Sequence, residues 1–123
     1  MIQNDYSPKY NQSHALLIGI NDYQNSTPLE YAKNDAVELA QVLVDKFKFP
    51  AKNVKLLLDS DATQENIRRN FLEYADGTHQ DDRLIFFFAG HGLTRTGSRG
   101  ETGFLVPYDG NPDNISTLIR WQE

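Results

Sequence analysis

The chain has 123 residues and no cysteine, which allows one domain or part of one and excludes disulfides and thiolate-bound metals. A formal charge of −5 argues against nucleic acid or an anionic membrane as the main partner. No apolar run approaches the roughly 20 residues of a membrane helix, and the polar leader over residues 1–13 lacks the basic start and apolar centre of a signal peptide. We therefore expect a cytoplasmic globular protein whose domain occupies residues 14–123.

The first half of the chain alternates buried strands with amphipathic helices. His14–Ile20 is an expected buried strand, followed by polar residues and a loop. Apolar residues then recur every three or four positions, which predicts a helix that starts at Leu29 and stops before Pro50. Val54–Leu58 is the second expected strand. The apolar positions of the helix are Leu29, Ala32, Ala36, Leu39, Leu43 and Phe47.

A second helix is expected after Thr63, whose hydroxyl can cap its first turn. The third strand, Arg83–Ala89, is almost entirely apolar, which is typical of a strand covered on both faces in a parallel sheet. The order strand–helix–strand–helix–strand predicts parallel strands joined by right-handed crossovers, and hence an α/β fold. The inward stripe of the second helix is expected to contain Ile67, Phe71, Leu72 and Ala75.

The remaining segments are less regular. Leu93–Thr102 is polar and rich in glycine, which indicates a loop. Gly103–Val106 is a short extended segment that ends before Pro107. The tail from Asn114 to Glu123 has apolar residues at helical spacing, which predicts the beginning of a further helix.

The most informative segment is Gly90-His91-Gly92, directly after the third expected strand. Open α/β sheets bind their ligands at the carboxyl ends of the strands. A histidine at that place can transfer protons near neutral pH. Glycines on both sides let a substrate approach the backbone and the imidazole closely. The sequence therefore predicts a candidate active site around His91.

Four segments stand in a characteristic order: 15–23 (ALLIGINDY), 32–36 (AKNDA), 88–92 (FAGHG) and 103–109 (GFLVPYD). Together they resemble the caspase-like cysteine peptidases, above all the metacaspase and prokaryotic caspase-like branch. The resemblance implies a caspase-like three-layer sandwich with a mostly parallel sheet. It also implies that the sheet is incomplete in this chain, since the strand that carries the nucleophile would follow Glu123.

In that family a histidine and a cysteine together attack a peptide carbonyl. The resemblance implies that His91 is the catalytic histidine and that the Gly92 amide is a donor of the oxyanion hole. It further implies that Asp35 lines the pocket that selects Arg or Lys before the scissile bond. The cysteine lies roughly 50 residues after the histidine in caspase-type sequences. It is therefore expected on sequence outside this chain or on a second chain, and this chain alone is expected to be inactive.

The expected partners are a protein or peptide substrate with Arg or Lys before the scissile bond, and a cysteine-bearing complementary segment. No cofactor is implied, and the loop 94–101 has a single acidic residue, which predicts no calcium site in this chain. Two other functions stay open at this level. One is a non-catalytic caspase-like scaffold or regulatory module, which the missing nucleophile favours. The other is a receiver-like domain phosphorylated on Asp59, at the end of the second strand.

Overall fold

The computed structural model describes residues 12–77 and 82–121. Of the expected polar leader, only Gln12 and Ser13 belong to this part. The described strands and helices are β1 (Ser13–Gly19), α1 (Ala32–Asp45), β2 (Val54–Leu58), α2 (Gln64–Gly77), β3 (Arg83–Ala89), β4 (Gly92–Gly97), β5 (Gly100–Leu105) and β6 (Ile119–Trp121). Short 3₁₀ turns occupy Ala51–Asn53, Asp59–Asp61 and Ile115–Thr117.

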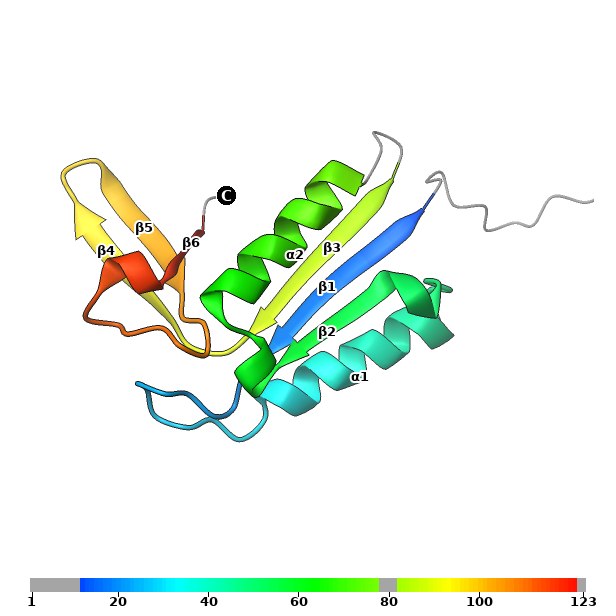
Figure 1. The fold of residues 1–123 in the computed structure, drawn as a ribbon, viewed down its shortest axis with the longest axis horizontal. Helices are drawn as coiled ribbons and strands as arrows, with labels where there is room; N and C mark the ends of the chain where they lie inside the picture. The colour runs from blue at the N-terminus through cyan, green and yellow to red at the C-terminus, as the bar shows by residue number, and fades with distance from the viewer. Residues whose placement is uncertain (1–11, 78–81, 122–123) are drawn as a thin grey trace, which may run out of the picture.

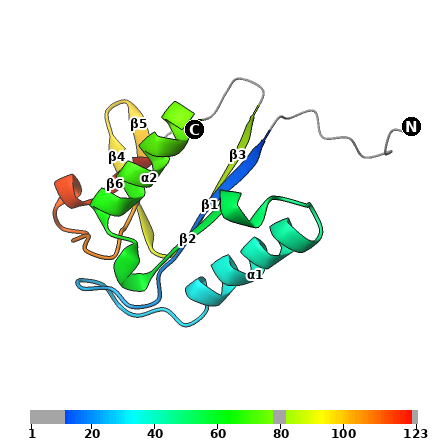
Figure 2. The same ribbon diagram turned by 45° about the vertical axis from the view of Figure 1, so that its right-hand side comes forward.

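The centre of the fold is a parallel sheet with the strand order β2-β1-β3. Its register places Leu17 of β1 beside Leu56 of β2 and Phe87 of β3. Helices α1 and α2 lie on opposite faces of this sheet (Figures 1 and 2). The predicted α/β fold with parallel strands, and the three layers that the resemblance implied, are confirmed.

The two faces of β1 account for the three layers. Ala15 and Leu17 pack into a core with the buried side of α1, whereas Leu16 and Ile18 pack into a second core that includes Ile67 of α2. Side chains alternate between the faces of a strand, so a shift of one residue in register would exchange the two sets. All four β1 residues have no exposed surface, which makes this strand the fixed centre of the sheet.

β3 is apolar like β1, but it forms the edge of the parallel sheet. Ile85 and Phe87 pack against the core under α1, and Phe86 and Phe88 pack against the core under α2. Both faces are therefore covered as expected, yet every residue of β3 is only half-buried. The reason is its edge position, since no further described strand lies beside it.

Helix α1 is shorter than the predicted helix at both ends. It begins after Leu29, which lies in the preceding loop. At the other end Lys48 adopts a left-handed conformation with a φ of 61°. This turn brings Phe49 into the core, where it is 3% exposed, and leaves Phe47 51% exposed. The sequence pattern had identified the wrong phenylalanine as the core residue.

β2 and the start of α2 are as predicted. β2 has the expected bounds, and α2 begins directly after Thr63. The backbone N–H of Asn66 donates to Thr63 Oγ1 over 3.1 Å, which is the geometry of an N-cap. Neither described α-helix is long and apolar enough to cross a membrane.

The predicted inward stripe of α2 is wrong in part. Ile67 is buried, but Phe71 is 41% and Leu72 62% exposed, and Ala75 is exposed as well. Tyr74 contacts the core instead, through its ring and a 3.4 Å hydrogen bond from its hydroxyl to the carbonyl oxygen of β1 residue Ala15. Because β3 is an edge strand, no described part of the sheet extends far enough to cover Phe71 and Leu72.

The expected loop at Leu93–Thr102 is instead a hairpin of β4 and β5. Leu93 pairs with Phe104, and Gly97 pairs with Gly100, whose φ of +109° suits the tight turn. The pattern Thr94-Arg95-Thr96 is polar on both faces, so it has no hydrophobic alternation to indicate a strand. The predicted extended segment after Gly103 is confirmed as the end of β5.

The expected helix at Asn114–Glu123 is also wrong for the residues that the structure describes. A single 3₁₀ turn at Ile115–Thr117 is capped by the Asn114 side chain, which accepts the Ser116 N–H. The chain then forms β6, in which Arg120 pairs with Phe104 of β5. Backbone pairing along β5 and burial of the intervening Leu118 outweigh the local helical spacing.

Candidate active site

His91 lies where the parallel sheet gives way to the hairpin. β3 ends at Ala89 and β4 begins at Gly92, so His91 stands at the carboxyl end of β3. The carboxyl ends of β1, β2 and β3 point to the same edge of the sheet (Figure 1). The loops that follow these strands meet there, which is where α/β sheets place their ligand sites.

The imidazole of His91 is held by the loop that follows β1. Its Nε2 lies 2.7 Å from the main-chain carbonyl oxygen of Thr27. A carbonyl can only accept a hydrogen bond, so Nε2 is the nitrogen that carries the proton, and Nδ1 is left as the basic nitrogen of the neutral ring. The loop is closed by a 2.8 Å hydrogen bond from Leu29 N–H to the carbonyl of Asn21. Sequence reasoning missed Thr27, because a main-chain acceptor requires no particular residue type.

The backbone of His91 is held by Tyr23. The His91 N–H donates to the Tyr23 hydroxyl over 2.7 Å, and the two rings lie 5.0 Å apart between centroids. A Cβ at Gly90 would collide with this hydroxyl and lie 3.0 Å from the Phe88 ring, so glycine is required there. Burial raises the pKa of Tyr23 to about 12, although the His91 N–H lowers it and the nearby Asp59 carboxylate raises it further. The phenol is therefore neutral at physiological pH.

The amide of Gly92 points away from β5. The Val106 N–H donates to the His91 carbonyl over 3.0 Å, so His91 and Val106 occupy a hydrogen-bonded pair of the antiparallel ladder. Such pairs alternate with pairs that exchange no hydrogen bonds, and the next pair is Gly92 with Leu105. β4 is an edge strand of its sheet. The Gly92 N–H is thus directed outward beside His91, where a ligand can accept it.

Asp59 anchors the start of the loop that holds His91. Its carboxylate accepts the backbone N–H groups of Asn21 at 2.9 Å and Asp22 at 3.2 Å, and pairs with Lys33 Nζ at 3.1 Å. Burial by itself would raise the pKa of Asp59, but the two amides and Lys33 outweigh it and lower that pKa. The carboxylate is therefore an ionised structural group, and it is already occupied by partners within the chain.

Asp35 lies on the first turn of α1 and is exposed. The start of α1 packs closely on the end of β1, because a Cβ at Gly19 would lie 2.7 Å from the Ala32 carbonyl oxygen. The start of α1 lies at the carboxyl end of the parallel sheet, where β3 leads into β4 (Figure 1). Asp35, in the first turn of α1, is therefore at the same end of the sheet as His91. In the part of the chain that the structure describes, its carboxylate has no hydrogen bond or ion pair, and none joins it to His91.

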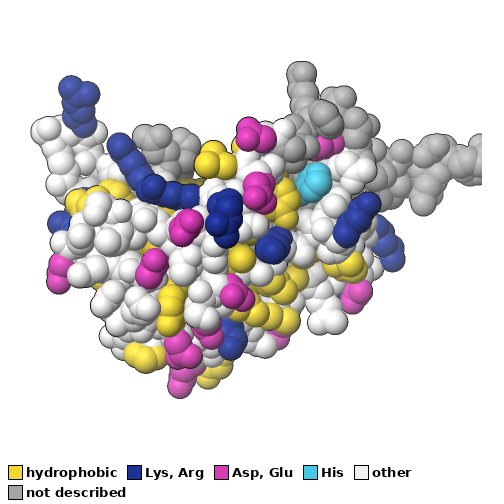
Figure 3. Space-filling model, in the orientation of Figure 1, with side chains coloured by type: hydrophobic (Ala, Val, Ile, Leu, Met, Phe, Trp, Pro, Cys, Tyr) yellow, Lys and Arg dark blue, Asp and Glu magenta, His cyan; other side chains and the backbone are white. Residues whose placement is uncertain are grey.

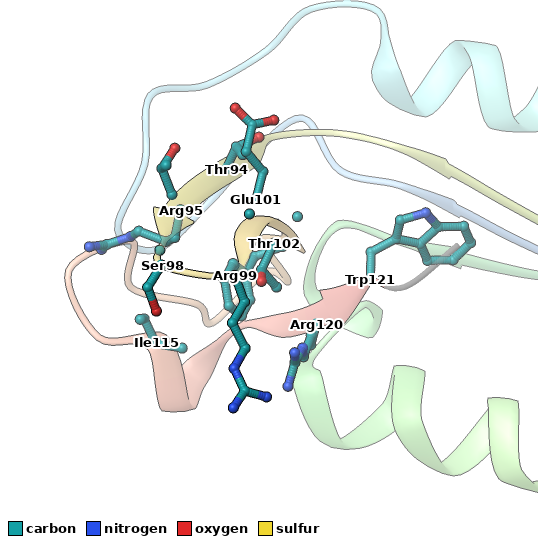
Figure 4. A pocket seen from close by; sticks show the side chains of 14 residues that line it. Thr94, Arg95, Ser98, Arg99, Glu101, Thr102, Ile115, Arg120 and Trp121 are labelled. Atoms are coloured by element: carbon teal, nitrogen blue, oxygen red, sulfur yellow. The ribbon is translucent and has the colours of Figure 1, made fainter.

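A hollow of about 1020 Å³ lies on the hairpin and does not include His91. Its lining is mostly polar backbone and side chains of β4 and β5, and Arg99 and Arg120 project to the same side of it (Figure 4). Its lining contains a single carboxylate, Glu101, among three arginines, and no histidine. We therefore place the candidate site at His91, on geometry rather than on cavity size.

A second hollow, of about 350 Å³, is an apolar groove between α2, β3 and β6. Trp121 stacks on Phe86 with ring centroids 5.6 Å apart, and Phe71 meets the same Phe86 ring edge-on. Hydrophobic side chains reach the surface between charged ones on the face seen in Figure 3. The residues that line the groove are Ile67, Arg68, Phe71, Leu72, Phe86, Leu105, Ile119, Arg120 and Trp121.

Comparison with known proteins decides the family. A model of the caspase domain matches residues 12–123, which is most of the chain. The chain belongs to the caspase domain family. The resemblance found in the sequence is confirmed, and a receiver-like function for the engaged Asp59 has no support from this family.

The relatives are metacaspases. The chain is 35% identical over 120 residues to metacaspase-7 of Arabidopsis thaliana, which covers 86% of this chain and 30% of that protein. It is 35% identical over 98 residues to metacaspase-1 of Plasmodium falciparum, covering 73% of this chain and 16% of the relative. The chain thus spans less than a third of the length of these relatives.

A solved structure supports the same fold. The protein GSU0716 from Geobacter sulfurreducens superposes with a TM-score of 0.67 over 80% of this chain and 40% of that one, at 19% sequence identity. At this identity the likeness shows the fold alone. Within residues 12–77 and 82–121 of this caspase domain, no three His, Asp or Glu side chains are grouped to hold a metal ion.

Proposed function

We propose that this chain is the histidine-bearing part of a cysteine endopeptidase that cleaves after Arg or Lys. The main support for the proposal is the hydrogen bond between His91 Nε2 and the Thr27 carbonyl oxygen. With Nε2–H donated to Thr27, Nδ1 is the nitrogen that can accept a thiol proton and later return it to the leaving amine. The Thr27 carbonyl also stabilises the imidazolium formed in between, since it accepts a charge-assisted hydrogen bond.

The second catalytic group in the proposal is the Gly92 amide. Its N–H points outward from the edge of β4 and adjoins His91. A preorganised N–H at that place can stabilise the oxyanion that develops when a thiolate attacks a peptide carbonyl. The same amide needs no movement to do so, because the β4–β5 pairing already fixes its direction.

The nucleophile is assigned to a cysteine-bearing segment outside this chain, either later in a longer polypeptide or on a second one. The chain has no cysteine and spans less than a third of its metacaspase relatives. The outer edge of β3 offers backbone N–H and C=O groups for a further strand. That edge runs from the apolar groove beside α2 to the carboxyl end next to His91, so an added strand parallel to β3 would end near the imidazole.

The basic specificity is assigned to Asp35. Its exposed carboxylate lies at the active-site end of the sheet and has no partner within the described chain. Asp59 is another acid close to this edge, but Lys33 and two amides occupy it. A substrate guanidinium or ammonium group can therefore pair with Asp35 without displacing an internal cation.

The test uses the cysteine-containing protein and reporter peptides with Arg, Lys or Asp before the scissile bond. We expect cleavage of the Arg and Lys peptides, and we expect His91→Ala to lower kcat about 10²–10⁴-fold. Asp35→Asn should raise KM for both basic peptides. Asp45→Asn, which removes the same charge from the far end of the same helix, should not.

Two outcomes would contradict the proposal. If the complete protein cleaves none of the peptides and His91→Ala changes no function, the chain is a non-catalytic scaffold or regulatory module. If the protein cleaves the Asp peptide as well as the basic ones, or if Asp35→Asn and Asp45→Asn behave alike, the specificity assigned to Asp35 is wrong.

A further inference from the structure

One loop holds His91 from two directions. Residues 21–29 supply the Thr27 carbonyl to the imidazole and the Tyr23 hydroxyl to the main-chain N–H, each over 2.7 Å. We propose that Tyr23 is a positioning residue, whose hydroxyl fixes the backbone of Gly90-His91-Gly92 so that the imidazole and the Gly92 amide face the substrate together. This inference rests on the proposed peptidase function.

The β4–β5 ladder has an irregular end at His91. His91 and Val106 occupy a hydrogen-bonded pair, in which the two residues ordinarily exchange both of their N–H groups. Here Val106 donates to the His91 carbonyl, but the His91 N–H turns to Tyr23 instead. The Tyr23 hydroxyl thus takes the place of one of the two hydrogen bonds expected between His91 and Val106. It thereby fixes the orientation of the peptide group whose N–H belongs to His91.

The Tyr23 hydroxyl is itself held in place. The Tyr23 ring packs against the core under α2 and also against the hairpin core of Phe104, Val106 and Leu118. Before Tyr23, the backbone N–H groups of Asn21 and Asp22 donate to the Asp59 carboxylate. After it, the N–H of Gln24 donates to the main-chain carbonyl oxygen of Tyr108 over 3.1 Å. A side chain fixed on both sides can define the geometry of its hydrogen-bond partner.

Gly90 has no side chain where it passes the Tyr23 hydroxyl. Any Cβ at this position would occupy the space of the Tyr23 hydroxyl. The turn between β3 and β4 is therefore shaped around that hydroxyl. Without it, the His91 N–H can pair with the Val106 carbonyl or with water, and the imidazole loses its alignment with Thr27.

The experiment compares Tyr23→Phe with a matched control in the cysteine-containing protein. Tyr74→Phe removes a hydroxyl of the same kind, since Tyr74 is also half-buried and bonded to a main-chain group, but at the opposite end of the sheet. We expect Tyr23→Phe to lower kcat about tenfold with KM within about twofold, because substrate binding is kept and alignment is lost. Tyr74→Phe should leave both constants unchanged.

A second readout does not need turnover. The imidazole nitrogens of selectively ¹⁵N-labelled His91, assigned with His91→Ala, should lose the pattern of an Nε2–H tautomer in Tyr23→Phe and keep it in Tyr74→Phe. Unchanged kcat and unchanged His91 resonances in Tyr23→Phe would overturn the inference, as would equal effects of the two variants. If His91→Ala keeps full activity, the peptidase proposal fails, while the His91 resonances still test the positioning role of Tyr23.

Discussion

The contact between Gly90 and the Tyr23 hydroxyl predicts a specific pattern of non-additive stability changes. In Gly90→Ala the new Cβ would overlap the hydroxyl and crowd the Phe88 ring, so the turn must move. Overpacking of this kind costs about 1–3 kcal/mol. Loss of the His91 N–H hydrogen bond adds about 1 kcal/mol. We therefore expect Gly90→Ala to lower the free energy of unfolding by about 2–4 kcal/mol in total.

Tyr23→Phe alone should cost about 1 kcal/mol, since it removes only the acceptor of that hydrogen bond. In the double variant the colliding oxygen is absent, and only the crowding by Phe88 remains. The two changes should therefore cost at least about 1 kcal/mol less together than the sum of their separate effects. Urea unfolding followed by circular dichroism, with equal m-values for all variants, gives the four free energies.

The control is Gly103→Ala, because a Cβ at Gly103 meets no atom within 4 Å. It should change the free energy of unfolding by less than about 0.5 kcal/mol. A free energy of unfolding for Gly90→Ala equal to that of Gly103→Ala would refute the clash at the Tyr23 hydroxyl, as would additive effects of Gly90→Ala and Tyr23→Phe.

Two further predictions concern the elements around the site. Thr63→Ala removes the N-cap of α2 and should cost about 1 kcal/mol in urea unfolding, whereas Thr63→Ser, which keeps the hydroxyl, should be nearly neutral. Asp59 has a folded-state pKa below its usual value of 3.8, so its contribution to stability is complete above that value and is lost as pH falls through the folded pKa. Acid unfolding of Asp59→Asn should therefore depend less steeply on pH below about 4 than that of the parent chain, and equal slopes would contradict the role of Asp59.

The parallel core could be read from the sequence because its signals are local. The apolar runs of β1, β2 and β3 and the capping hydroxyl of Thr63 indicate their structures without knowledge of distant residues. The Gly90-His91-Gly92 segment likewise places the candidate site, since a strand end followed by glycines is visible in the chain itself. These elements agree with the structure to within a residue or two.

The hairpin and the tail could not be read in this way. Thr94-Arg95-Thr96 becomes a strand because Gly100–Leu105 pairs with it, and Ile119–Trp121 becomes a strand because β5 has a second edge. Tertiary pairing of this kind overrides local preference. Phe71 and Leu72 follow the pattern of a buried helix face, but the face lies beyond the last described strand. The hydrogen bond from His91 to Thr27 has no sequence signal at all, because its acceptor is the backbone.

Because His91 Nε2 bonds to a main-chain oxygen, position 27 can tolerate substitution even though its carbonyl orients the imidazole. An alanine scan would pass over position 27, since every amino acid supplies the same carbonyl oxygen to His91 Nε2. Substitutions should instead have an effect where they move the backbone of the loop. Leu29 is such a position, because its N–H closes the loop by donating to the Asn21 carbonyl. A proline at position 29 would delete that N–H, whereas a substitution at position 27 leaves the Thr27 carbonyl in place. A histidine whose ring is oriented by a main-chain carbonyl can thus keep its partner while the side chain at position 27 changes.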